Sequence, residues 1–334
     1  MTVDSPARLA SGSGGVAPMV DNPAVSEIGV VVVTHAAQHH LPHCLPPLLH
    51  SPLRPRVLVV NSSSDDGTVE LACEMGAETL VVPRRHFNHG LTRELARRHL
   101  ACRIVVMLTP DAYADDVDFL DRLTRPIRMD QAVVAYGRQL PREGAGLVER
   151  FGRAFNYPAE PQLRSLVDWP TYGSYTHFCS NACAAWLNAA LDSIGGFRAT
   201  LVSEETIAVA ELLGRGGRIA YVADAVVRHS HDYRLVDELR RHFDVGWTRA
   251  RFRELLLARE PDETRGRAFV AELVRTVLRE QPGLLPGALA SLVARLLGYR
   301  LGLVGDRLPL ALARRLSGQD YFWSSSAFVD GAVA

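Results

Sequence analysis

The sequence has no excess of charge of either sign. It contains 37 Lys and Arg residues against 37 Asp and Glu residues, so its formal net charge at pH 7 is zero. Nucleic-acid-binding domains usually carry a basic excess, so this balance argues against nucleic-acid binding as the main activity. Apolar residues make up 47% and charged residues 22%, which is ordinary for a soluble globular protein.

Cysteine is scarce, and its spacing does not suggest a metal site. The five cysteines are an odd number, and none forms a CxxC pair. Cys179 and Cys183 are four positions apart, but no second pair completes a zinc site. We therefore interpret them as buried free thiols in a reducing compartment.

Long apolar segments are also missing. No stretch is expected to reach the length of a transmembrane helix. Residues 1–26 are rich in Ser, Gly, Ala and Pro, lack the apolar core of a signal peptide and are interpreted as a flexible leader. The protein is therefore expected in the cytoplasm, with a peripheral contact at the inner membrane face left open.

Three apolar runs each end in polar residues. Residues 28–33 lead to Thr34, residues 57–60 lead to the turn NSSSDDGT, and residues 103–108 lead to Asp111. Helix-like stretches and a short strand separate them, at 41–49, 68–75, 79–82 and 91–99. This alternation predicts an α/β fold with a mostly parallel, Rossmann-like sheet flanked by helices. Ligands bind beyond the carboxyl ends of such strands, so we predict a nucleotide pocket with Asp111 at its mouth.

The remainder of the chain is expected to continue the sheet and then to become helical. A helix within 113–130 and a strand at 131–137 precede an excursion at 141–169, which has the length of a functional lid. Further elements are predicted at 187–194 (helix), 204–213 (helix), 218–222 and 225–229 (strands joined by a turn at 223–224), and 236–249, 265–279, 286–298 and 308–316 (helices).

Asp111 and two histidines are candidate metal ligands. A carboxylate at a strand end can hold a divalent cation that neutralises a diphosphate leaving group, although Asp is also a common turn cap. His229 and His231 are two apart on a predicted strand and therefore face the same side. They can complete a metal site with Asp111 or contact phosphate; the alternative is an exposed strand end.

Two acidic residues and a polar turn suggest further chemistry. Glu204 and Glu205 open a predicted helix, where the helix dipole stabilises acids, but either can also be a general base for an acceptor hydroxyl. The turn at 86–90 enters a helix that begins near His89 and Gly90, a geometry suited to phosphate. Arg93 can add a charge-assisted contact there, or it can be a surface residue beside a helix cap.

Basic and apolar residues crowd the C-terminal helices. They are interpreted either as solvated and core faces or as a surface for lipid phosphate. The basic cluster comprises Arg240, Arg241, His242, Arg249, Arg251 and Arg253, and the Leu-Leu pairs lie within 284–297.

Taken together, these segments resemble the family 2 glycosyltransferases with a GT-A fold, and most closely their bacterial rhamnosyltransferase branch. The resemblance spans residues 27–325. It is carried by VNSSSDDGT at 60–68, FNHGLTR at 87–93, LTPDA at 108–112, SNACAAW at 180–186, IGGF at 194–197, SEE at 203–205, IAYVADA at 219–225, HSH at 229–231, and the RRLS and FW elements of the tail 308–323.

The resemblance implies an inverting, metal-dependent transfer of one sugar in cell-surface polysaccharide synthesis. The implied donor is dTDP-L-rhamnose, the cofactor is Mg²⁺ or Mn²⁺, and the acceptor is a glycan or glycolipid at the inner membrane face; a homodimer is left open. The implied site residues are Glu205 and Glu204 (catalytic); Thr34, Asn61, Ser63, Asp66, His89, Gly90, Arg93 and Asp111 (nucleotide sugar); Asn181, Trp186, Gly195 and Gly196 (acceptor side); and Asp111, His229 and His231 (metal).

The resemblance also implies a division of the chain. A leader at 1–26 would precede a GT-A domain at 27–233, with its nucleotide-sugar half at about 27–112 and its acceptor half at about 113–233. A helical C-terminal extension would occupy 234–334.

Several positions depart from the family pattern. Asn61 stands where Asp is usual. Its amide oxygen can still accept a hydrogen bond, but it lacks the negative charge of a carboxylate. Glu205 replaces Asp and places the base one methylene further out, where a shift of about 1 Å can cost on the order of 100-fold in rate. Leu187 and Asn188 replace an Arg-Arg pair. These changes leave open a UDP- or GDP-sugar donor, and also a degenerate protein that binds nucleotide sugar or acts as a scaffold without turnover.

Two further enzyme classes are disfavoured. A nucleotidyltransferase would need a Gly-rich loop with Lys or Arg after the first strand, and the sequence has none. A processive transferase would carry a QxxRW motif, which is also missing, so one sugar is expected per encounter.

Overall fold

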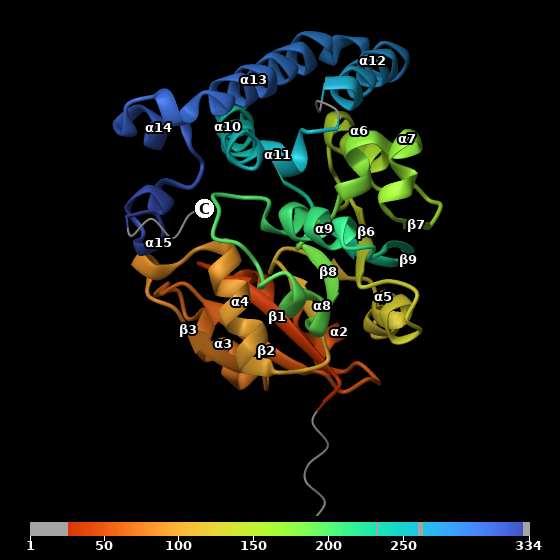
Figure 1. Cartoon of the computed structure of the whole chain (residues 1–334), viewed down its shortest axis with the longest axis vertical. Coiled ribbons are helices and arrows are strands. Elements are labelled where there is room, and N and C mark those ends of the chain that lie inside the picture. The colour runs from red at the N-terminus through yellow and green to blue at the C-terminus, as the bar shows by residue number, and fades with distance from the viewer. Residues whose placement is uncertain (1–25, 232, 260–262, 330–334) are drawn as a thin grey trace, which may run out of the picture.

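Residues 28–108 contain four strands that form a parallel sheet. The structure, a computed structural model, describes residues 26–231, 233–259 and 263–329, so the predicted leader lies almost wholly outside the described residues. The strands β1 (Ile28–Thr34), β2 (Arg56–Asn61), β3 (Glu78–Val81) and β4 (Ile104–Leu108) are parallel, in the order β3-β2-β1-β4. This arrangement brings the polar ends of β1, β2 and β4 to one sheet edge (Figure 1).

The second half of the chain extends the same sheet with mixed strand directions. The strand β8 (Cys183–Leu187) runs antiparallel to β4 and to β6 (Val134–Leu140), and β6 is parallel to β9 (Ile219–Arg228). Two short strands, β5 (Tyr113–Ala114) and β7 (Gln162–Arg164), pair antiparallel with β9. The α/β fold is as predicted, and the parallel pairing holds for β1–β4 and for β6 with β9, while β8 makes the whole sheet mixed.

Helices cover both faces of the sheet because its central strands are apolar on both sides. Val30 and Val32 belong to one core, with α1 (Leu41–Cys44), α2 (Pro46–Leu49), α3 (Thr68–Glu74) and α5 (Phe119–Arg128). Val31 and Val33 belong to the other, with α4 (His89–Leu100), α8 (Asn188–Ser193) and α9 (Glu204–Gly214). The alternation along β1 places its successive side chains on opposite faces, as the geometry of a strand requires.

Two predictions for the acceptor half are wrong in detail. The expected turn at 223–224 is a bulge within one continuous strand, because the register slips from Gly137↔Val222 to Arg138↔Val226. The expected lid at 141–169 is also not a plain loop. It contains α6 (Leu147–Asn156), strand β7 and the start of α7 (Trp169–Tyr172), so part of it is tied to the sheet.

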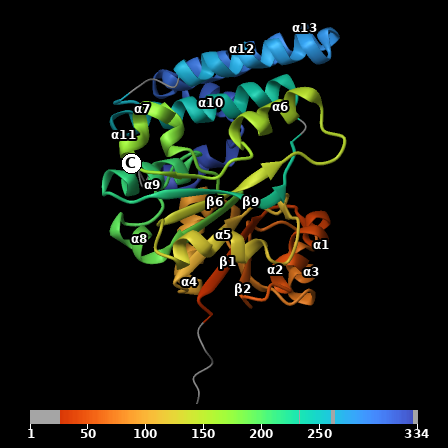
Figure 2. The ribbon, with the colours of Figure 1, turned by 90° about the vertical axis from the view of Figure 1, so that its right-hand side faces the viewer.

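The C-terminal extension is helical, as predicted. It comprises α10 (Leu235–Arg251), α11 (Arg253–Leu256), α12 (Glu263–Glu280), α13 (Leu285–Leu303), α14 (Leu310–Leu316) and α15 (Ser326–Val329). The helices α12 and α13 form a layer beyond α10, on the side away from β1 and β2 (Figure 2).

Glycines explain why α13 is longer than predicted. A Cβ added at Gly298 would overlap the carbonyl oxygen of Leu239, and one added at Gly302 would overlap that of Phe243. Gly298 therefore does not end the helix; it lets the backbones of α10 and α13 approach closely. The expectation that no stretch reaches transmembrane length is wrong for this reason: within the described residues, Pro282–Leu303 is one helical segment of 22 residues with a hydropathy of 1.3.

The cysteines agree with their interpretation as free thiols. Cys73 is exposed, and the other four are buried and free: Cys44, Cys102, Cys179 and Cys183.

Candidate active site

Asp111, His229 and His231 form a cluster suited to a metal ion. Asp111 follows β4, and the two histidines follow β9, so the topology of the sheet brings together residues far apart in the chain. Asp111 Oδ2 lies 3.2 Å from His229 Nε2 and 3.6 Å from His231 Nδ1. The three candidate ligand atoms all lie within 4.8 Å of one another.

Gln139 fixes the orientation of His229. Its Oε1 lies 2.8 Å from His229 Nδ1 and also accepts from Arg153, while its Nε2 donates to Ser180 Oγ at 3.0 Å. An amide oxygen can only accept, so His229 Nδ1 carries the proton and Nε2 presents a lone pair toward Asp111. A lone pair facing a carboxylate is repulsive, and a divalent cation between the two groups would satisfy both.

The charge states of the cluster also fit a cation. Burial alone would raise the pKa of Asp111, but at the acidic pH where this carboxyl titrates, a protonated His229 donates to it and lowers that pKa below its usual range. Burial lowers the pKa of His229, and burial together with the charge of His229 lowers that of His231 to about 3. At neutral pH the cluster is thus one carboxylate and two neutral imidazoles, a ligand set that divalent transition metals accept.

The turn after β2 is organised by its own side chains. Asn61 is fully buried; its Nδ2 donates to Thr34 Oγ1 at 3.3 Å and to Ser64 Oγ at 2.8 Å. Asp66 accepts from Gln38 N at 3.0 Å, from Ser64 Oγ at 2.8 Å and from Thr68 Oγ1 at 2.6 Å. Thr34 and Asn61 therefore lie together at the end of β1 and β2, while Asp66 already accepts from three donors, two of them local and one at Gln38 after β1.

Ser63 has a conformational role in the same turn. Its φ is +57°, in the left-handed region, and its hydroxyl donates to Val82 O at 3.0 Å. These contacts tie the turn to the end of β3.

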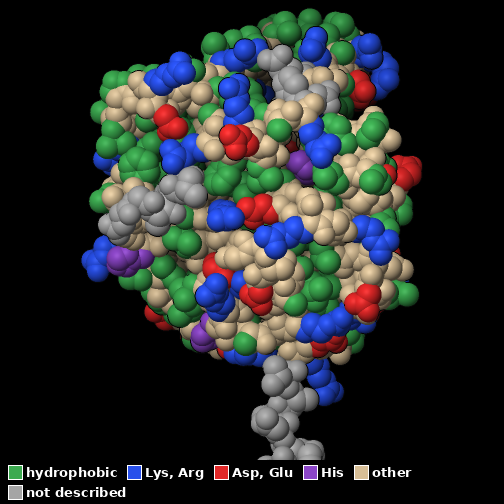
Figure 3. All heavy atoms as spheres, viewed as in Figure 1, with side chains coloured by type: hydrophobic (Ala, Val, Ile, Leu, Met, Phe, Trp, Pro, Cys, Tyr) green, Lys and Arg blue, Asp and Glu red, His purple; other side chains and the backbone are tan. Residues whose placement is uncertain are grey.

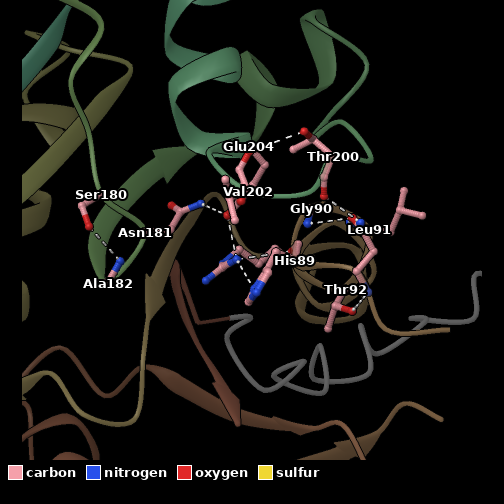
Figure 4. Close-up of polar contacts among 12 residues, drawn as sticks. His89, Gly90, Leu91, Thr92, Ser180, Asn181, Ala182, Thr200, Val202 and Glu204 are labelled. Atoms are coloured by element: carbon pink, nitrogen blue, oxygen red, sulfur yellow. Dashed lines mark hydrogen bonds and ion pairs between the residues drawn. The ribbon is translucent and has the colours of Figure 1, made fainter. Parts of the chain in front are cut away.

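The Asn88 side chain caps the start of α4. Asn88 Oδ1 accepts from Gly90 N at 3.0 Å and from Leu91 N at 3.1 Å, so the first backbone donors are capped. A Cβ at Gly90 would overlap Arg198 O. Gly90 therefore permits close contact between α4 and the segment before α9 (Figure 4).

Arg93 links this helix to Glu204. Arg93 Nη1 lies 2.6 Å from Glu204 Oε1, and both side chains are about 95% buried, with 5% and 4% exposed. Asn181 Nδ2 donates to the same carboxylate oxygen at 2.9 Å, and its Oδ1 accepts from Trp186 Nε1 at 2.9 Å. Figure 4 shows Asn181 pointing toward Glu204, with His89 below them in the view. Trp186 lies fully in the core, so its contribution is to hold Asn181.

Glu205 differs from its neighbour. Among the described residues no cation forms an ion pair with it, and it follows Ser203, whose φ of +66° is unusual for a residue with a side chain. Burial, and then the charge of Glu204, raise the pKa of Glu205 to about 8. Burial alone would raise the pKa of Glu204 as well, but Arg93 lowers it overall. The structure thus provides one permanently ionised glutamate and one that can exchange a proton near neutral pH.

Gly195 and Gly196 form a turn beside α4. Both have positive φ, of +83° and +87°, and a Cβ at Gly196 would overlap the Glu94 carboxylate. Glu94 Oε2 in turn accepts from Phe197 N at 3.0 Å. These two glycines therefore position the chain before α9.

Comparison with known proteins identifies the family. No family model matches the chain. It is 30% identical over 303 residues to the O-antigen chain rhamnosyltransferase RfbN of Salmonella typhimurium, covering 90% of this chain and 96% of that protein. It is 31% identical over 272 residues to the O-antigen chain rhamnosyltransferase WbaN of Salmonella anatum, covering 81% and 86%.

The chain belongs to the bacterial rhamnosyltransferase branch of the family 2 glycosyltransferases. It is therefore a glycosyltransferase. Solved structures agree on the GT-A fold. A mannosyltransferase from Pyrobaculum calidifontis, in complex with GDP-Man and Mn²⁺, aligns with a TM-score of 0.54 at 18% identity, over 91% of this chain and 87% of that one. TarS of S. aureus aligns with a TM-score of 0.52 at 14% identity, over 91% and 92%.

The site of this glycosyltransferase includes residues that the motifs did not reveal. Tyr233 stacks on His231 with ring centroids 4.8 Å apart, and its hydroxyl accepts from Arg241 Nη1 at 3.0 Å. Arg241 is also an electrostatic neighbour of Glu205, so a residue of α10 influences both parts of the site. Only its membership in a basic run had marked it in the sequence.

The C-terminal segment supplies another unexpected contact. Tyr321 lies with its hydroxyl 3.1 Å from His89 Nε2 and hydrogen-bonded to Gln319. Arg84 stacks over the Tyr321 ring at 4.0 Å and donates to Ser62 Oγ at 3.0 Å. No local pattern links residue 321 to the turn after β2, so sequence spacing alone could not have found this contact.

Proposed function

We propose that this glycosyltransferase transfers one L-rhamnose from dTDP-L-rhamnose to a glycan or lipid-linked acceptor in cell-surface polysaccharide synthesis. The Asp111, His229 and His231 cluster at the carboxyl ends of β4 and β9 carries the proposal, because it fits a cation at a diphosphate. The relatives RfbN and WbaN are O-antigen chain rhamnosyltransferases, which supports the sugar and the pathway.

The reaction is a displacement with inversion. The acceptor hydroxyl attacks the anomeric carbon, the bond from that carbon to the diphosphate breaks, and dTDP leaves. Mg²⁺ or Mn²⁺ held by Asp111, His229 and His231 would stabilise the negative charge that develops on the diphosphate. The P. calidifontis mannosyltransferase, which shares the fold, is in complex with GDP-Man and Mn²⁺ in its solved structure.

Glu205 is the proposed general base. A base works best with a pKa near the operating pH, and that of Glu205 is raised to about 8. Its longer side chain takes the place of the shorter Asp of the family. Glu204 is the proposed positioning residue, since its ion pair with Arg93 and its bond from Asn181 hold the start of α9 in place.

Thr34 and Asn61 are the proposed contacts for the nucleotide base. Both lie buried at the ends of β1 and β2, and the Asn61 amide can exchange its bonds within the turn for bonds to a base. Ser63, Asp66, His89, Gly90 and Arg93 support this site through the contacts given above. Asn181, Trp186, Gly195 and Gly196 are proposed to shape the acceptor side in the same indirect way.

Calorimetric titration tests the donor and the metal together. We would titrate wild type and Asp111→Asn with dTDP, UDP and GDP, each with and without Mn²⁺ or Mg²⁺. Wild type is expected to bind dTDP most tightly and only with metal, and Asp111→Asn is expected to lose at least about 10-fold in affinity. Asp116→Asn is the matched control, because Asp116 is half-exposed and pairs with Arg122.

Other results of these titrations would contradict the donor, the metal site or catalysis separately. Preference for UDP or GDP would keep the site and overturn the donor. Metal-independent binding, or full affinity in Asp111→Asn, would overturn the metal assignment. Binding of dTDP without release of dTDP from dTDP-L-rhamnose across acceptors would favour a non-catalytic scaffold.

A further inference from the structure

The helix α13 presents its large apolar side chains away from the protein. Two of its glycines, Gly298 and Gly302, pack against the backbone of α10. Five large apolar residues on the other side are each at least 40% exposed and are called the α13 ridge: Leu289, Val293, Leu296 and Leu297 of the helix, and Val304 directly after it. A surface helix of a soluble protein normally has the opposite arrangement, in which the large apolar side chains face the protein core.

The ridge is continuous along the helix. Leu289, Val293, Leu296 and Leu297 are separated by four, three and one residues, so they share one face of the helix, and Val304 follows its last turn. Only 17% of the apolar 18-residue stretch within Pro282–Leu303 is buried inside the protein. Exposed apolar surface of this extent usually marks a site of contact.

Arginines outnumber acidic residues in the segment that carries the ridge. Residues 263–316 contain nine Arg and four acidic residues, and the whole chain contains no lysine. Arg307, Arg314 and Arg315 are exposed near one end of α13. Arg314 and Arg315, with Arg240, line a cavity of about 630 Å³ beside α14. In Figure 3, green apolar and blue arginine side chains crowd the upper edge, over α12 and α13.

We propose that the α13 ridge and its arginines dock this protein on the surface of a membrane containing anionic lipid. An apolar helical face flanked by Arg matches such a surface, because the apolar side chains enter the acyl boundary while the cations meet lipid phosphates. The proposal concerns binding alone and does not depend on the donor or on catalysis.

Two other environments fit the ridge less well. The helix does not span a bilayer on its own, because α10 covers one face and Arg295 of α13 pairs with Glu238 of α10 at 2.5 Å. A second copy of the chain docked by two-fold symmetry would cover the apolar residues of the ridge. It would not supply the anionic phosphates that the exposed Arg307, Arg314 and Arg315 complement, so we commit to anionic lipid and make the second copy an outcome of the test.

Vesicle sedimentation of the full chain tests the proposal. We expect wild type to sediment with phosphatidylcholine vesicles that contain phosphatidylglycerol and to remain mostly in solution with phosphatidylcholine alone. Val293→Asp/Leu296→Asp should weaken binding at least about 10-fold, because two charges enter the apolar face. Arg314→Ser/Arg315→Ser should retain apolar binding but lose much of the preference for anionic lipid.

The matched control exchanges an equally exposed Leu and Val elsewhere. Leu163 and Val167 are 46% and 84% exposed on the acceptor half, and Leu163→Asp/Val167→Asp should sediment like wild type. Far-UV circular dichroism and the urea unfolding midpoint should be the same in all variants, which verifies that they fold. Because neither measurement uses a nucleotide, loss of vesicle binding is separated both from misfolding and from failure of the proposed enzymatic function.

Three results would overturn the proposal. Wild type could fail to bind vesicles of either composition, the ridge variant could bind as wild type does, or the control could lose binding equally. A wild-type dimer that Val293→Asp/Leu296→Asp converts to a monomer, with no vesicle binding, would instead assign the ridge to a second copy.

Discussion

At the scale of single residues, two adjacent glutamates have been given different chemistry by their surroundings. Glu204 lies against Arg93 and accepts from Asn181, and its pKa is lowered overall. Glu205 lies one position further on, without such a cation, and its pKa is raised to about 8. Separating the pKa values of two neighbouring carboxyls is how a site assigns a fixed charge to one and a mobile proton to the other.

Replacement of Glu205 should therefore stop turnover without affecting donor binding. Glu205→Gln is expected to lower kcat by about 10²- to 10⁴-fold, because the amide cannot accept the acceptor proton. In wild type the ionised form is the base, so kcat/KM should rise as the pH increases through about 8 and then level off. Initial rates of dTDP release between about pH 6 and pH 10, with dTDP affinity by calorimetry, measure both effects.

A glutamate on the same helix provides the control. Glu211 pairs with Arg198 at 2.8 Å, and Glu211→Gln should keep both turnover and the pH profile. Wild-type turnover in Glu205→Gln, or a profile that does not change across this pH range, would contradict the role of Glu205 as base.

At the scale of elements, the pairing of α10 with α13 depends on missing side chains. Gly298 and Gly302 let the α13 backbone touch the carbonyls of Leu239 and Phe243. This close approach fixes how α13 is rotated about its own axis, and so it determines which apolar residues form the exposed ridge.

A methyl group at Gly298 should destabilise the protein. Gly298→Ala places a Cβ against the Leu239 carbonyl, and forcing the helices apart is expected to cost about 1–3 kcal/mol. Gly287→Ala in the same helix meets nothing within 4 Å and should be neutral or stabilising by up to about 1 kcal/mol. Urea unfolding measures both, and shifts of the same sign and size would show that close packing is not the cause.

At the scale of the whole molecule, one buried ion pair joins the two halves of the α/β domain. Arg93 of α4 and Glu204 of α9 are 111 residues apart in the chain, and each is nearly buried. Removing one partner of such a pair leaves the other charge buried and unpaired, which is more damaging than removing both.

A double-mutant cycle tests this link. Arg93→Met is expected to cost about 3–5 kcal/mol of unfolding free energy, and Arg93→Met/Glu204→Met should cost clearly less than the sum of the single changes. Arg122→Met, which breaks a more exposed pair with Asp116, should cost at most about 1 kcal/mol. Additive costs in the urea unfolding of the cycle variants would show that the two side chains do not stabilise each other.

Much of the fold follows from local patterns. The apolar runs before Thr34, Asn61 and Asp111 correctly predicted β1, β2 and β4, because a strand covered on both faces needs continuous apolar residues. The bulge in β9 was not predictable, since it depends on how β9 pairs with β6. The length of α13 was missed because Gly298, which by itself weakens a helix, packs here against the Leu239 carbonyl and lies inside the helix.

The sequence by itself determined the α/β class, the family and the residue types of the site, because motif spacing and strand periodicity are properties of the chain alone. Only the tertiary structure decided their partners. In the folded protein His229 lies against Asp111, and Arg93 forms a buried ion pair with Glu204 instead of facing solvent. The apolar side chains of the α13 ridge are exposed. The physical reason is that charge state, tautomer and exposure depend on neighbours from distant segments, which sequence distance does not encode.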